Sequence, residues 1–209
     1  MPKLKMPRSS PSLDMTPMVD LAFLLVTFFM LTANFRPEEA VAVDTPSSMS
    51  QSPIPTENML TILVDSTGKV FWDFTDKKMR FAVLDALGKR IGWTPTDEEK
   101  VRFANVGPVG VPIQELPKFL ALPDATARKA FLKTFSGIPT EDGNNQLAEW
   151  IVTTRALFFE SAGINPIVAL KADGNTNYTK VAEVIRIFQS PGIKINRFKM
   201  ITDLEESRM

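Results

Sequence analysis

The sequence predicts a single N-terminal transmembrane α-helix followed by an α+β domain, in which helices back a small mixed sheet. Three observations lead to this fold class. An apolar run near the N-terminus is long enough to span a bilayer, a β-hairpin pattern opens the remaining chain, and a strand–helix–strand pattern closes it. The predicted parts are a tail over residues 1–16, a membrane helix over 17–35, a flexible linker over 36–57 and the α+β domain over 58–209.

The composition excludes several classes of protein. Lys and Arg total 24 and balance 24 Asp and Glu, so the chain lacks the overall basic field that nucleic-acid-binding proteins carry. Without Cys or His, it can build no disulfide, no Cys or His metal ligand and no His-dependent catalytic centre. No Gly-rich phosphate-binding loop occurs either. We therefore expect no enzyme, no cofactor and no metal site, and proton chemistry near neutral pH must use a carboxylate or a lysine.

The apolar run Leu21–Leu31 lies inside the predicted membrane helix. Residues 17–35 give roughly 28 Å of helix at ~1.5 Å per residue, which just spans a hydrocarbon core of about 30 Å. Thr16 is a suitable N-cap, and Pro17 suits the first helical position because its missing N–H would have no partner there. The tail before the helix carries the basic residues Lys3, Lys5 and Arg8. The positive-inside rule then places the N-terminus in the cytoplasm and the C-terminal domain across the membrane.

Three other interpretations of this segment stay open. A signal peptide also has a basic start and a short apolar run, although Asp20 at its front edge is unusual and Leu31–Ala33 is a poor cleavage site. A buried core helix would need matching apolar surface nearby. An interfacial helix would have a strongly polar face, which this segment lacks.

The polar residues of the predicted membrane helix form one narrow stripe. Asp20, Thr27 and Asn34 follow one another at seven-residue intervals, which is nearly two full turns. An Asp inside a membrane span costs roughly 2.5–3.5 kcal/mol, so such residues usually face protein or a wet cavity and have a function. A single helix would leave this polar stripe in contact with lipid. The segment therefore predicts partner helices that cover the stripe.

The stripe also suggests a chemical role. A low dielectric favours the neutral form of a carboxyl group, so Asp20 can take up a proton on one side of the membrane and release it on the other. We predict Asp20 as the proton carrier, with Thr16, Thr27 and Asn34 as its polar support in the helix. The alternative is that Asp20 lies at the membrane surface as a helix-start residue favoured by the helix dipole.

The start of the C-terminal domain has clear local patterns. Glu38–Glu57 is rich in Pro, Ser and Thr and predicts a flexible linker, with partial strand order as the alternative. Leu60–Val64 and Lys69–Phe74 are strand-like runs around a Gly-containing turn and predict a β-hairpin. Apolar residues at helical spacing over 79–87 predict a helix that the following glycines end.

The middle region, about residues 92–163, is predicted to be mainly helical. Its predicted elements are a capping-box helix from Thr96–Glu99, short helices over Pro112–Leu122 and Asp124–Phe135, a loop over Gly137–Asn145, and a longer amphipathic helix over Gln146–Ser161 that ends at Gly163. We expect its aromatic residues in the core rather than in a ligand site. These are Phe131, Phe135, Trp150, Phe158 and Phe159.

The C-terminal pattern is a strand, a helix and a strand. Ile167–Leu170 is strand-like, and apolar residues between Val181 and Phe188 have the spacing of a helix that buries one face. The alternation over Ile193–Ile201 predicts a last strand. A strand–helix–strand unit with a short crossover usually pairs its strands in parallel through a right-handed connection.

The residues at the head of the predicted membrane helix resemble the signature of the ExbD/TolR family. Asp14-Met-Thr-Pro-Met-Val-Asp20 has the form Asn/Asp-x-Thr-Pro-x-x-Asp, which in that family follows a short cytoplasmic tail and opens a single membrane helix. By this resemblance, Asp20 matches the protonatable residue of the family.

Two further parts of the chain are similar to the family. The ending from Ile167–Asp173 through Val181–Phe188 to Pro191–Ile193 resembles its periplasmic ending. Ala40–Pro46 resembles, more weakly, a short Val-x-Leu-Pro segment that can pair as a strand with the periplasmic domain, with Thr45 in place of the Leu. The middle region exceeds what the compact family domain needs, and no family role is carried onto it.

The resemblance implies a function and partners. It implies a single-pass protein of the bacterial inner membrane, an ExbD-like subunit of a motor that uses the proton motive force to energise TonB-dependent outer-membrane transport. The implied partners are an oligomeric ExbB/TolQ-like membrane protein, a second copy of the chain and a TonB-like or TolA-like periplasmic protein. One alternative is a TolR-like role in envelope integrity with binding to peptidoglycan. Another, from a different class, is a membrane-tethered periplasmic binding module.

Overall fold

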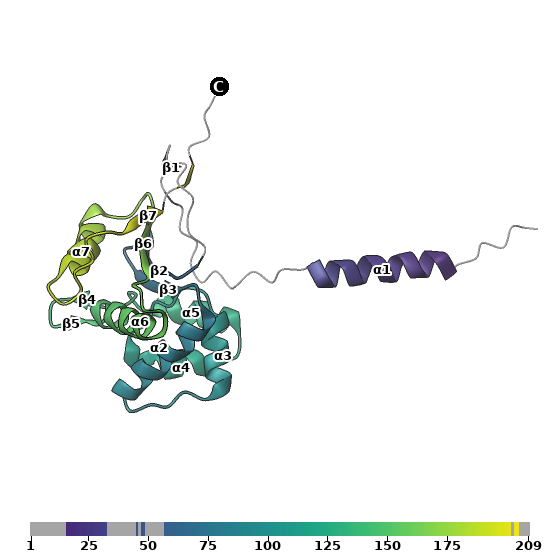
Figure 1. Ribbon diagram of the computed structural model, residues 1–209, viewed down its shortest axis with the longest axis horizontal. Helices are drawn as coiled ribbons and strands as arrows, with labels where there is room; N and C mark the ends of the chain where they lie inside the picture. The colour runs from purple at the N-terminus through teal and green to yellow at the C-terminus, as the bar shows by residue number, and fades with distance from the viewer. Residues whose placement is uncertain (1–15, 33–44, 46, 49–56, 202, 205–209) are drawn as a thin grey trace, which may run out of the picture. The chain divides into compact units, whose positions relative to one another are not determined.

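The computed structural model describes residues 16–32, 45, 47–48, 57–201 and 203–204 (Figure 1). The chain divides into two compact units, Met1–Arg36 and Pro37–Met209.

Helix α1 (Thr16–Thr32) is the described part of the N-terminal unit. Thr16, predicted as the N-cap, is instead the first helical residue, so the helix begins one residue earlier than expected. Residues 1–15 and 33–35, which include Asn34, lie outside the described residues. Among the described residues no helix is both long enough and apolar enough to cross a membrane, and α1 has 17 residues. The membrane span therefore stays a prediction.

The C-terminal unit is built on a four-stranded mixed sheet with the strand order β3-β2-β6-β7 (Figure 1). Its strands are β2 (Met59–Val64), β3 (Val70–Phe74), β6 (Ile167–Ala172) and β7 (Lys199–Ile201). Strand β2 pairs antiparallel with β3, whereas β6 pairs in parallel with both β2 and β7. The predicted mixed sheet, its hairpin and its parallel C-terminal ending are confirmed.

Asp65 closes the hairpin turn between β2 and β3. Its carboxylate accepts hydrogen bonds from the backbone N–H groups of Thr67 and Lys69, both at 2.9 Å. Gly68 follows with a φ of 81°, a left-handed conformation that favours glycine. These local interactions fix the register that pairs Val64 with Val70.

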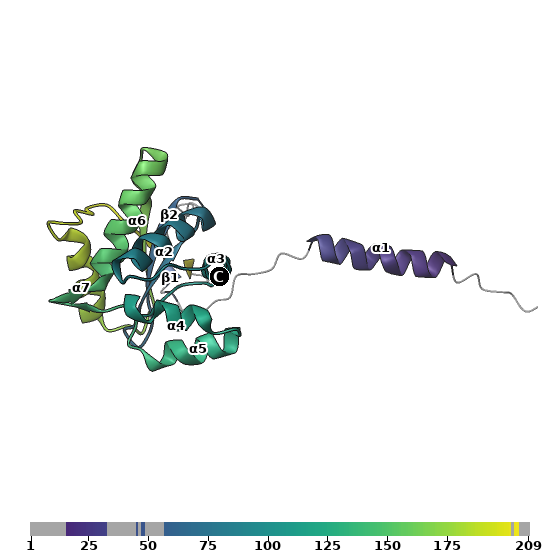
Figure 2. The same cartoon turned by 90° about the horizontal axis from the view of Figure 1, so that it is seen from below.

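Helices pack on this sheet, and short strands complete the described part of the unit. The helices are α2 (Lys77–Arg90), α3 (Asp97–Asn105), the 3₁₀ turn η1 (Ile113–Glu115), α4 (Leu116–Ala121), α5 (Ala125–Thr134), α6 (Gln146–Ala162) and α7 (Tyr178–Gln189). The short strands are β1 (Ser47–Ser48), β4 (Thr140–Glu141), β5 (Asn144–Asn145) and β8 (Asp203–Leu204). Helix α6 lies between α2 and α7 (Figure 2).

Side-chain caps explain where several helices begin. Thr96 and Glu99 form the predicted capping box at α3: the Glu99 N–H donates to Thr96 Oγ1 at 3.3 Å, and the Thr96 N–H donates to Glu99 Oε2 at 2.8 Å. Asn177 caps α7 by accepting a hydrogen bond from the Thr179 N–H at 2.9 Å. Helix α6 ends at Gly163, as predicted, with a φ of 71°.

The predicted last strand is wrong over most of its length. Of Ile193–Ile201, only Lys199–Ile201 is strand. Lys194 has a left-handed backbone with a φ of 52°, and the Ile195 N–H donates to the Phe188 carbonyl at 2.8 Å. The segment therefore folds back onto the end of α7 before it can pair with β6, and Ile193 is buried in a loop.

Three other predictions need smaller corrections. The predicted helix Pro112–Leu122 divides into η1 and α4. The expected loop Gly137–Asn145 contains the antiparallel pair β4–β5. Within the predicted linker 36–57, β1 pairs in parallel with β8, so part of the linker is ordered as a strand, which is the alternative prediction. Thr45, in the same linker, is buried.

The middle region covers the β3 edge of the sheet. Trp72 and Val109 exchange two backbone hydrogen bonds, each of 2.8 Å, and the Ile138 N–H donates to the Val70 carbonyl at 2.9 Å. Gly137 lies against the same strand, and a Cβ atom there would approach the Val70 nitrogen to 2.5 Å. The backbone groups of this edge are thus satisfied by the inserted residues.

Stacked aromatic side chains form the centre of the core. Trp72 of β3 lies against Trp150 of α6, with ring centroids 4.8 Å apart, and against Phe103 of α3 at 6.0 Å. The Trp72 Nε1–H donates to Thr154 Oγ1 at 3.1 Å, which satisfies a fully buried donor. The sheet, the middle region and α6 therefore share one core.

The aromatic residues predicted for the core have different outcomes. Trp150 and Phe158 are buried, and Phe131 and Phe135 are partly buried against the core, as predicted. Phe159 is 54% exposed, so its prediction is wrong. Phe158 and Phe159 point to different sides of α6, and only the Phe158 side faces the sheet, where it contacts Phe74.

A buried arginine connects three segments around this core. The Arg80 side chain of α2 is 4% exposed and pairs with the Asp73 carboxylate of β3. Its guanidinium also donates to the backbone carbonyls of Phe103, Val106 and Gly107 at 3.2, 2.8 and 3.0 Å. Burial lowers the pKa of the Arg80 guanidinium, while Asp73 acts in the opposite direction.

Replacing Arg80 should destabilise the C-terminal unit strongly. Arg80→Met leaves three carbonyls and the Asp73 carboxylate without their donor, so we expect a loss of about 3 kcal/mol in the free energy of unfolding, measured by urea denaturation. The control is Arg90→Met, because Arg90 is exposed and only touches Glu149 at 3.4 Å; it should cost under about 0.5 kcal/mol. Equal losses in the two variants would contradict a structural role for the Arg80 contacts.

Two glycines test the contact at the β3 edge. Gly137 and Gly143 both have left-handed backbones, with φ values of 88° and 95°, so alanine strains both positions similarly. A Cβ at Gly143 meets nothing within 4 Å, whereas one at Gly137 meets the Val70 backbone. Gly137→Ala should therefore lower the free energy of unfolding by at least about 1 kcal/mol more than Gly143→Ala. Urea denaturation of both variants measures the difference, and a smaller effect at Gly137 would argue against the close approach.

Candidate functional site

Asp20 and Thr27 lie on the same face of α1. They line one open hollow of about 500 Å³ together with Pro17, Leu21, Phe23 and Leu24. The placement follows from the helix, because residues seven apart lie nearly above one another. Asp20 and Thr27 therefore share one face of the helix, whereas Asn34 and the side chain of Thr16 lie outside the described part of the chain. The supporting polar stripe stays a prediction.

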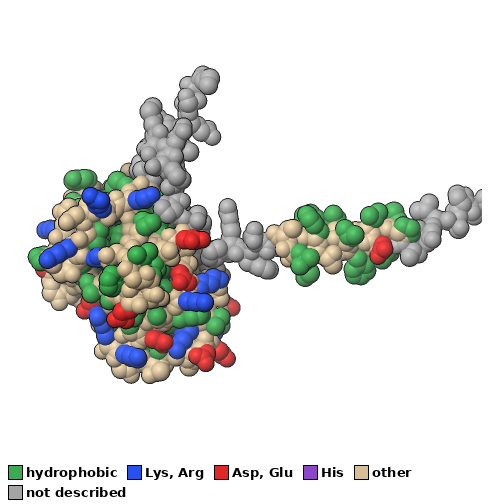
Figure 3. All heavy atoms as spheres, viewed as in Figure 1, with side chains coloured by type: hydrophobic (Ala, Val, Ile, Leu, Met, Phe, Trp, Pro, Cys, Tyr) green, Lys and Arg blue, Asp and Glu red, His purple; other side chains and the backbone are tan. Residues whose placement is uncertain are grey.

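The remaining described surface of α1 is apolar except at Thr32. Its large hydrophobic side chains are at least half exposed, from Val19 at 50% to Leu31 at 88%. Figure 3 shows these side chains around the helix, with one acidic side chain among them. Such a surface is unstable in water and requires cover by lipid or by other apolar helices.

Hydroxyl groups on α1 bond within the helix. Thr27 Oγ1 donates to the Leu24 carbonyl at 3.0 Å, and Thr32 Oγ1 donates to the Phe28 carbonyl at 2.7 Å. Both threonines thus satisfy their protons locally, as hydroxyls in apolar surroundings do. Asp20 is the one ionisable side chain between Thr16 and Thr32, and it is the group of α1 that can bind and release a proton.

A polar hollow lies at the start of α7 in the C-terminal unit. It has a volume of about 500 Å³ and lies between the β2–β3 turn, the segment around β4 and the first turns of α7. Lys180 Nζ donates to Thr140 Oγ1 at 2.7 Å and forms an ion pair with Glu183 at 3.1 Å. Burial raises the pKa of Glu183, but hydrogen bonds with Thr140 and Lys180 and the charges of Lys180 and Arg186 outweigh it, so the pKa is lowered.

This polar hollow was not predicted from the sequence. The available signal was the spacing of Lys180 and Glu183, which places both on one face of a helix. Nothing in the sequence indicated that Thr140, forty positions earlier, would complete the cluster. The interactions join the middle region to α7 and so have a clear structural role.

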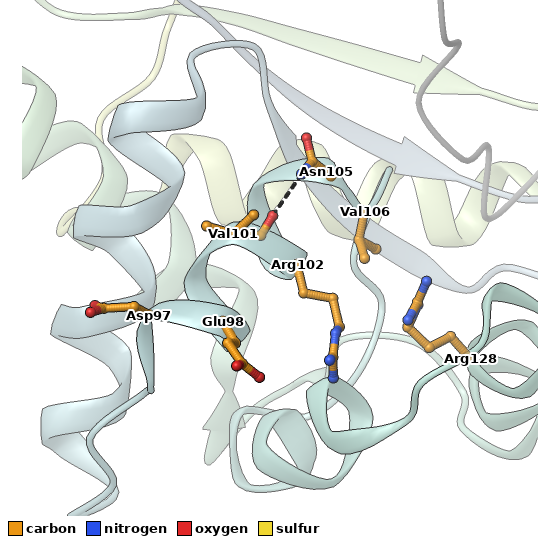
Figure 4. Close-up of a pocket in the computed structure, with 7 residues that line it drawn as sticks. All are labelled: Asp97, Glu98, Val101, Arg102, Asn105, Val106 and Arg128. Atoms are coloured by element: carbon orange, nitrogen blue, oxygen red, sulfur yellow. Dashed lines mark hydrogen bonds between the residues drawn. The ribbon is translucent and has the colours of Figure 1, made fainter.

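A second hollow, of about 600 Å³, lies between α3 and α5 of the middle region (Figure 4). Arg102 extends across it and donates to the Leu120 carbonyl, and Arg128 donates to the Leu122 and Pro123 carbonyls at 3.0 and 3.2 Å. The two arginines therefore hold the end of α4 between α3 and α5. Among the described residues, no three acidic side chains lie close enough to hold a metal ion.

Comparison with known proteins identifies the N-terminal half of the chain. Residues 6–104 match the family described as biopolymer transport protein ExbD/TolR. These residues form an ExbD/TolR family domain. Searches of curated proteins and of solved structures gave no match.

The ExbD/TolR match contains the whole of α1 and its Asp20 hollow, the hairpin β2–β3 and α2. It ends at Ala104, one residue before the end of α3. The boundary falls inside the middle region, which the sequence had marked as larger than the compact family domain needs. The C-terminal strands β6 and β7 lie beyond the match, and their parallel pairing is known from the structure alone.

The lowered pKa of Glu183 predicts a pH-dependent contribution to the stability of the C-terminal unit. A carboxylate with a lowered pKa stabilises the fold above its unfolded value, about 4.3, and this contribution disappears as the pH falls through the folded value. Glu183→Gln should therefore lower the free energy of unfolding at pH 7, by under about 1 kcal/mol because the pair is partly solvated. Urea denaturation should show this difference shrink as the pH falls below the unfolded value of about 4.3. A deficit that persists at low pH would instead indicate lost packing; Glu149→Gln is the exposed control.

Proposed function

We propose that this chain is the ExbD-like subunit of a motor in the bacterial inner membrane that uses the proton motive force to energise TonB-dependent outer-membrane transport. The observation that supports it best is Asp20, the one ionisable group of an otherwise apolar helix, at the family's Thr-Pro-x-x-Asp position within the matched residues. The membrane span, the cytoplasmic N-terminus and the periplasmic C-terminal unit are parts of this proposal.

The proposed mechanism uses Asp20 as the proton carrier. Each proton that crosses a 100 mV potential releases about 2.3 kcal/mol. In a site closed to water the protonated carboxyl is neutral and tolerates apolar surroundings, whereas the carboxylate requires water or a polar partner. Protonation and release thus change the surroundings that Asp20 prefers, and this change would move α1 relative to the helices around it.

The apolar surface of α1 supports the proposed membrane partners. An ExbB/TolQ-like oligomer, together with a second copy of the chain, would cover the helix and enclose the Asp20 hollow. The hollow between Phe23 and Leu24 gives a neighbouring helix room to approach the carboxyl group.

The C-terminal unit would pass the motion on to a TonB-like or TolA-like partner. A unit that transmits force must be stiff, and here one core of stacked rings joins the sheet to α3 and α6. The proton is the only coupling ion in this proposal, and no cofactor takes part.

Asp20→Asn tests the proposal. Asparagine keeps the size of the side chain but cannot carry a proton, so we expect loss of growth on a nutrient that requires energised outer-membrane import, with unchanged co-purification of the membrane partner. Asp14→Asn is the matched control and should keep full growth, because Asn is accepted at that position of the Asn/Asp-x-Thr-Pro-x-x-Asp form. Full import activity in Asp20→Asn would refute the proton-carrier role. A defect in envelope integrity with normal import would assign the TolR-like role instead.

A further inference from the structure

The C-terminal end of α6 has apolar side chains that the described part of the unit does not cover. Phe159, Ile164 and Ile167 are 54%, 58% and 37% exposed, and we call these three residues the α6 tip. Figure 2 shows the last turns of α6 projecting from the rest of the unit. Isolated exposed apolar residues are common on protein surfaces, but three within nine positions around the end of one helix are a candidate patch.

The ending of the helix makes this exposure unusual. The Gly163 N–H donates to the Phe159 carbonyl at 2.8 Å, and Gly163 has a left-handed backbone that turns the chain back over the last turn. At such endings the apolar residue after the glycine commonly packs on the one at the position of Phe159. Here Phe159 and Ile164 both stay more than half exposed, so the pair is available to an external surface.

Other contacts place the tip beside a basic loop. Arg155 of α6 donates to the Ile193 carbonyl and to Asn165 Oδ1, the latter at 3.3 Å. The segment between α7 and β7 is thereby held next to the residues that follow α6. In Figure 2 this yellow segment lies on the same side as the projecting end of α6.

Three exposed basic side chains lie near the tip. Lys194, Arg197 and Lys199 are exposed and belong to the held loop or to the first residue of β7; we call them the basic rim. The parallel register, with Ala169 opposite Lys199, places this rim at the end of the sheet where β6 begins. The described acidic residues near this end include Glu57, Asp76 and Glu160.

We propose that the α6 tip and the basic rim bind an anionic phospholipid surface. Apolar side chains flanked by long cationic ones suit a bilayer, where the rings and aliphatic groups enter the interface and the Lys and Arg termini reach the phosphates. A protein fits this surface less well than a phospholipid bilayer does, because Lys is depleted in protein–protein interfaces. The inference goes beyond the proposed function and needs from it only that α1 lies in a bilayer.

The test uses the full chain in nanodiscs of phosphatidylcholine with about 30% phosphatidylglycerol, an anionic fraction large enough to attract a basic patch. The chain has no cysteine, so a single fluorophore can be attached at Ser161→Cys, an exposed position beside the tip, or at Asp142→Cys before the start of α6. Helix α6 has 17 residues and separates the two sites by about 25 Å. Spin-labelled lipids quench fluorophores that lie at the bilayer surface.

We expect quenching at position 161 to exceed that at position 142 by at least about twofold, and to fall to the level at 142 in pure phosphatidylcholine, where the anionic phosphates are diluted out. Phe159→Ser with Ile164→Ser, or charge reversal at Lys194, Arg197 and Lys199, should abolish the excess in the Ser161→Cys chain. These residues are exposed, so we expect the substitutions to leave the thermal unfolding midpoint unchanged. An unchanged midpoint shows that the variants fold.

Equal quenching at the two positions would overturn the proposal. Disulfide-linked dimers through Ser161→Cys without lipid quenching would also overturn it, in favour of contact between copies of the chain. Asp20→Asn should leave the quenching at position 161 unchanged, so failure of this inference and failure of the proton-carrier role are distinguishable.

Discussion

The burial of Trp72 is the constraint on which the C-terminal unit depends. This ring belongs to the edge strand of the hairpin, yet it is fully buried because Phe103 and Trp150 pack on it from two helices that are distant in the sequence. Arg80 lies 5.4 Å from the Trp72 ring and holds the end of α3 through backbone carbonyls. Burial of the Trp72 ring and pairing of the buried Arg80 charge thus stabilise the same part of the unit, and movement of either side chain would disturb the other.

This arrangement explains why the long middle region is compatible with a compact sheet domain. Residues beyond the ExbD/TolR match are not appended at the surface; Val109 and Ile138 supply hydrogen bonds to β3, and α6 packs on α2. An exposed strand edge attracts other strands, and here the inserted residues cover it. The insertion is therefore an integral part of the domain's stability.

The two units differ in the kind of side chain that they expose. In the C-terminal unit apolar side chains are buried and charged groups are at the surface or paired, as in any water-soluble fold. In α1 the apolar side chains are outside and the one carboxyl group shares a face with Thr27, an arrangement that water disfavours. The same chain thus combines an apolar helix that needs cover with a domain that has its own buried core.

The sequence by itself determined the features that depend on near neighbours. The hairpin turn at Asp65, the capping box at Thr96 and the shared face of Asp20 and Thr27 each arise from residues within a few turns of one another, and the structure has all three. Only the tertiary structure decided the burial of Arg80, the exposure of Phe159 and the Lys180–Thr140 contact. These depend on which distant segment packs against a residue, and helical or strand spacing identifies the face that is apolar but not the surface that will cover it.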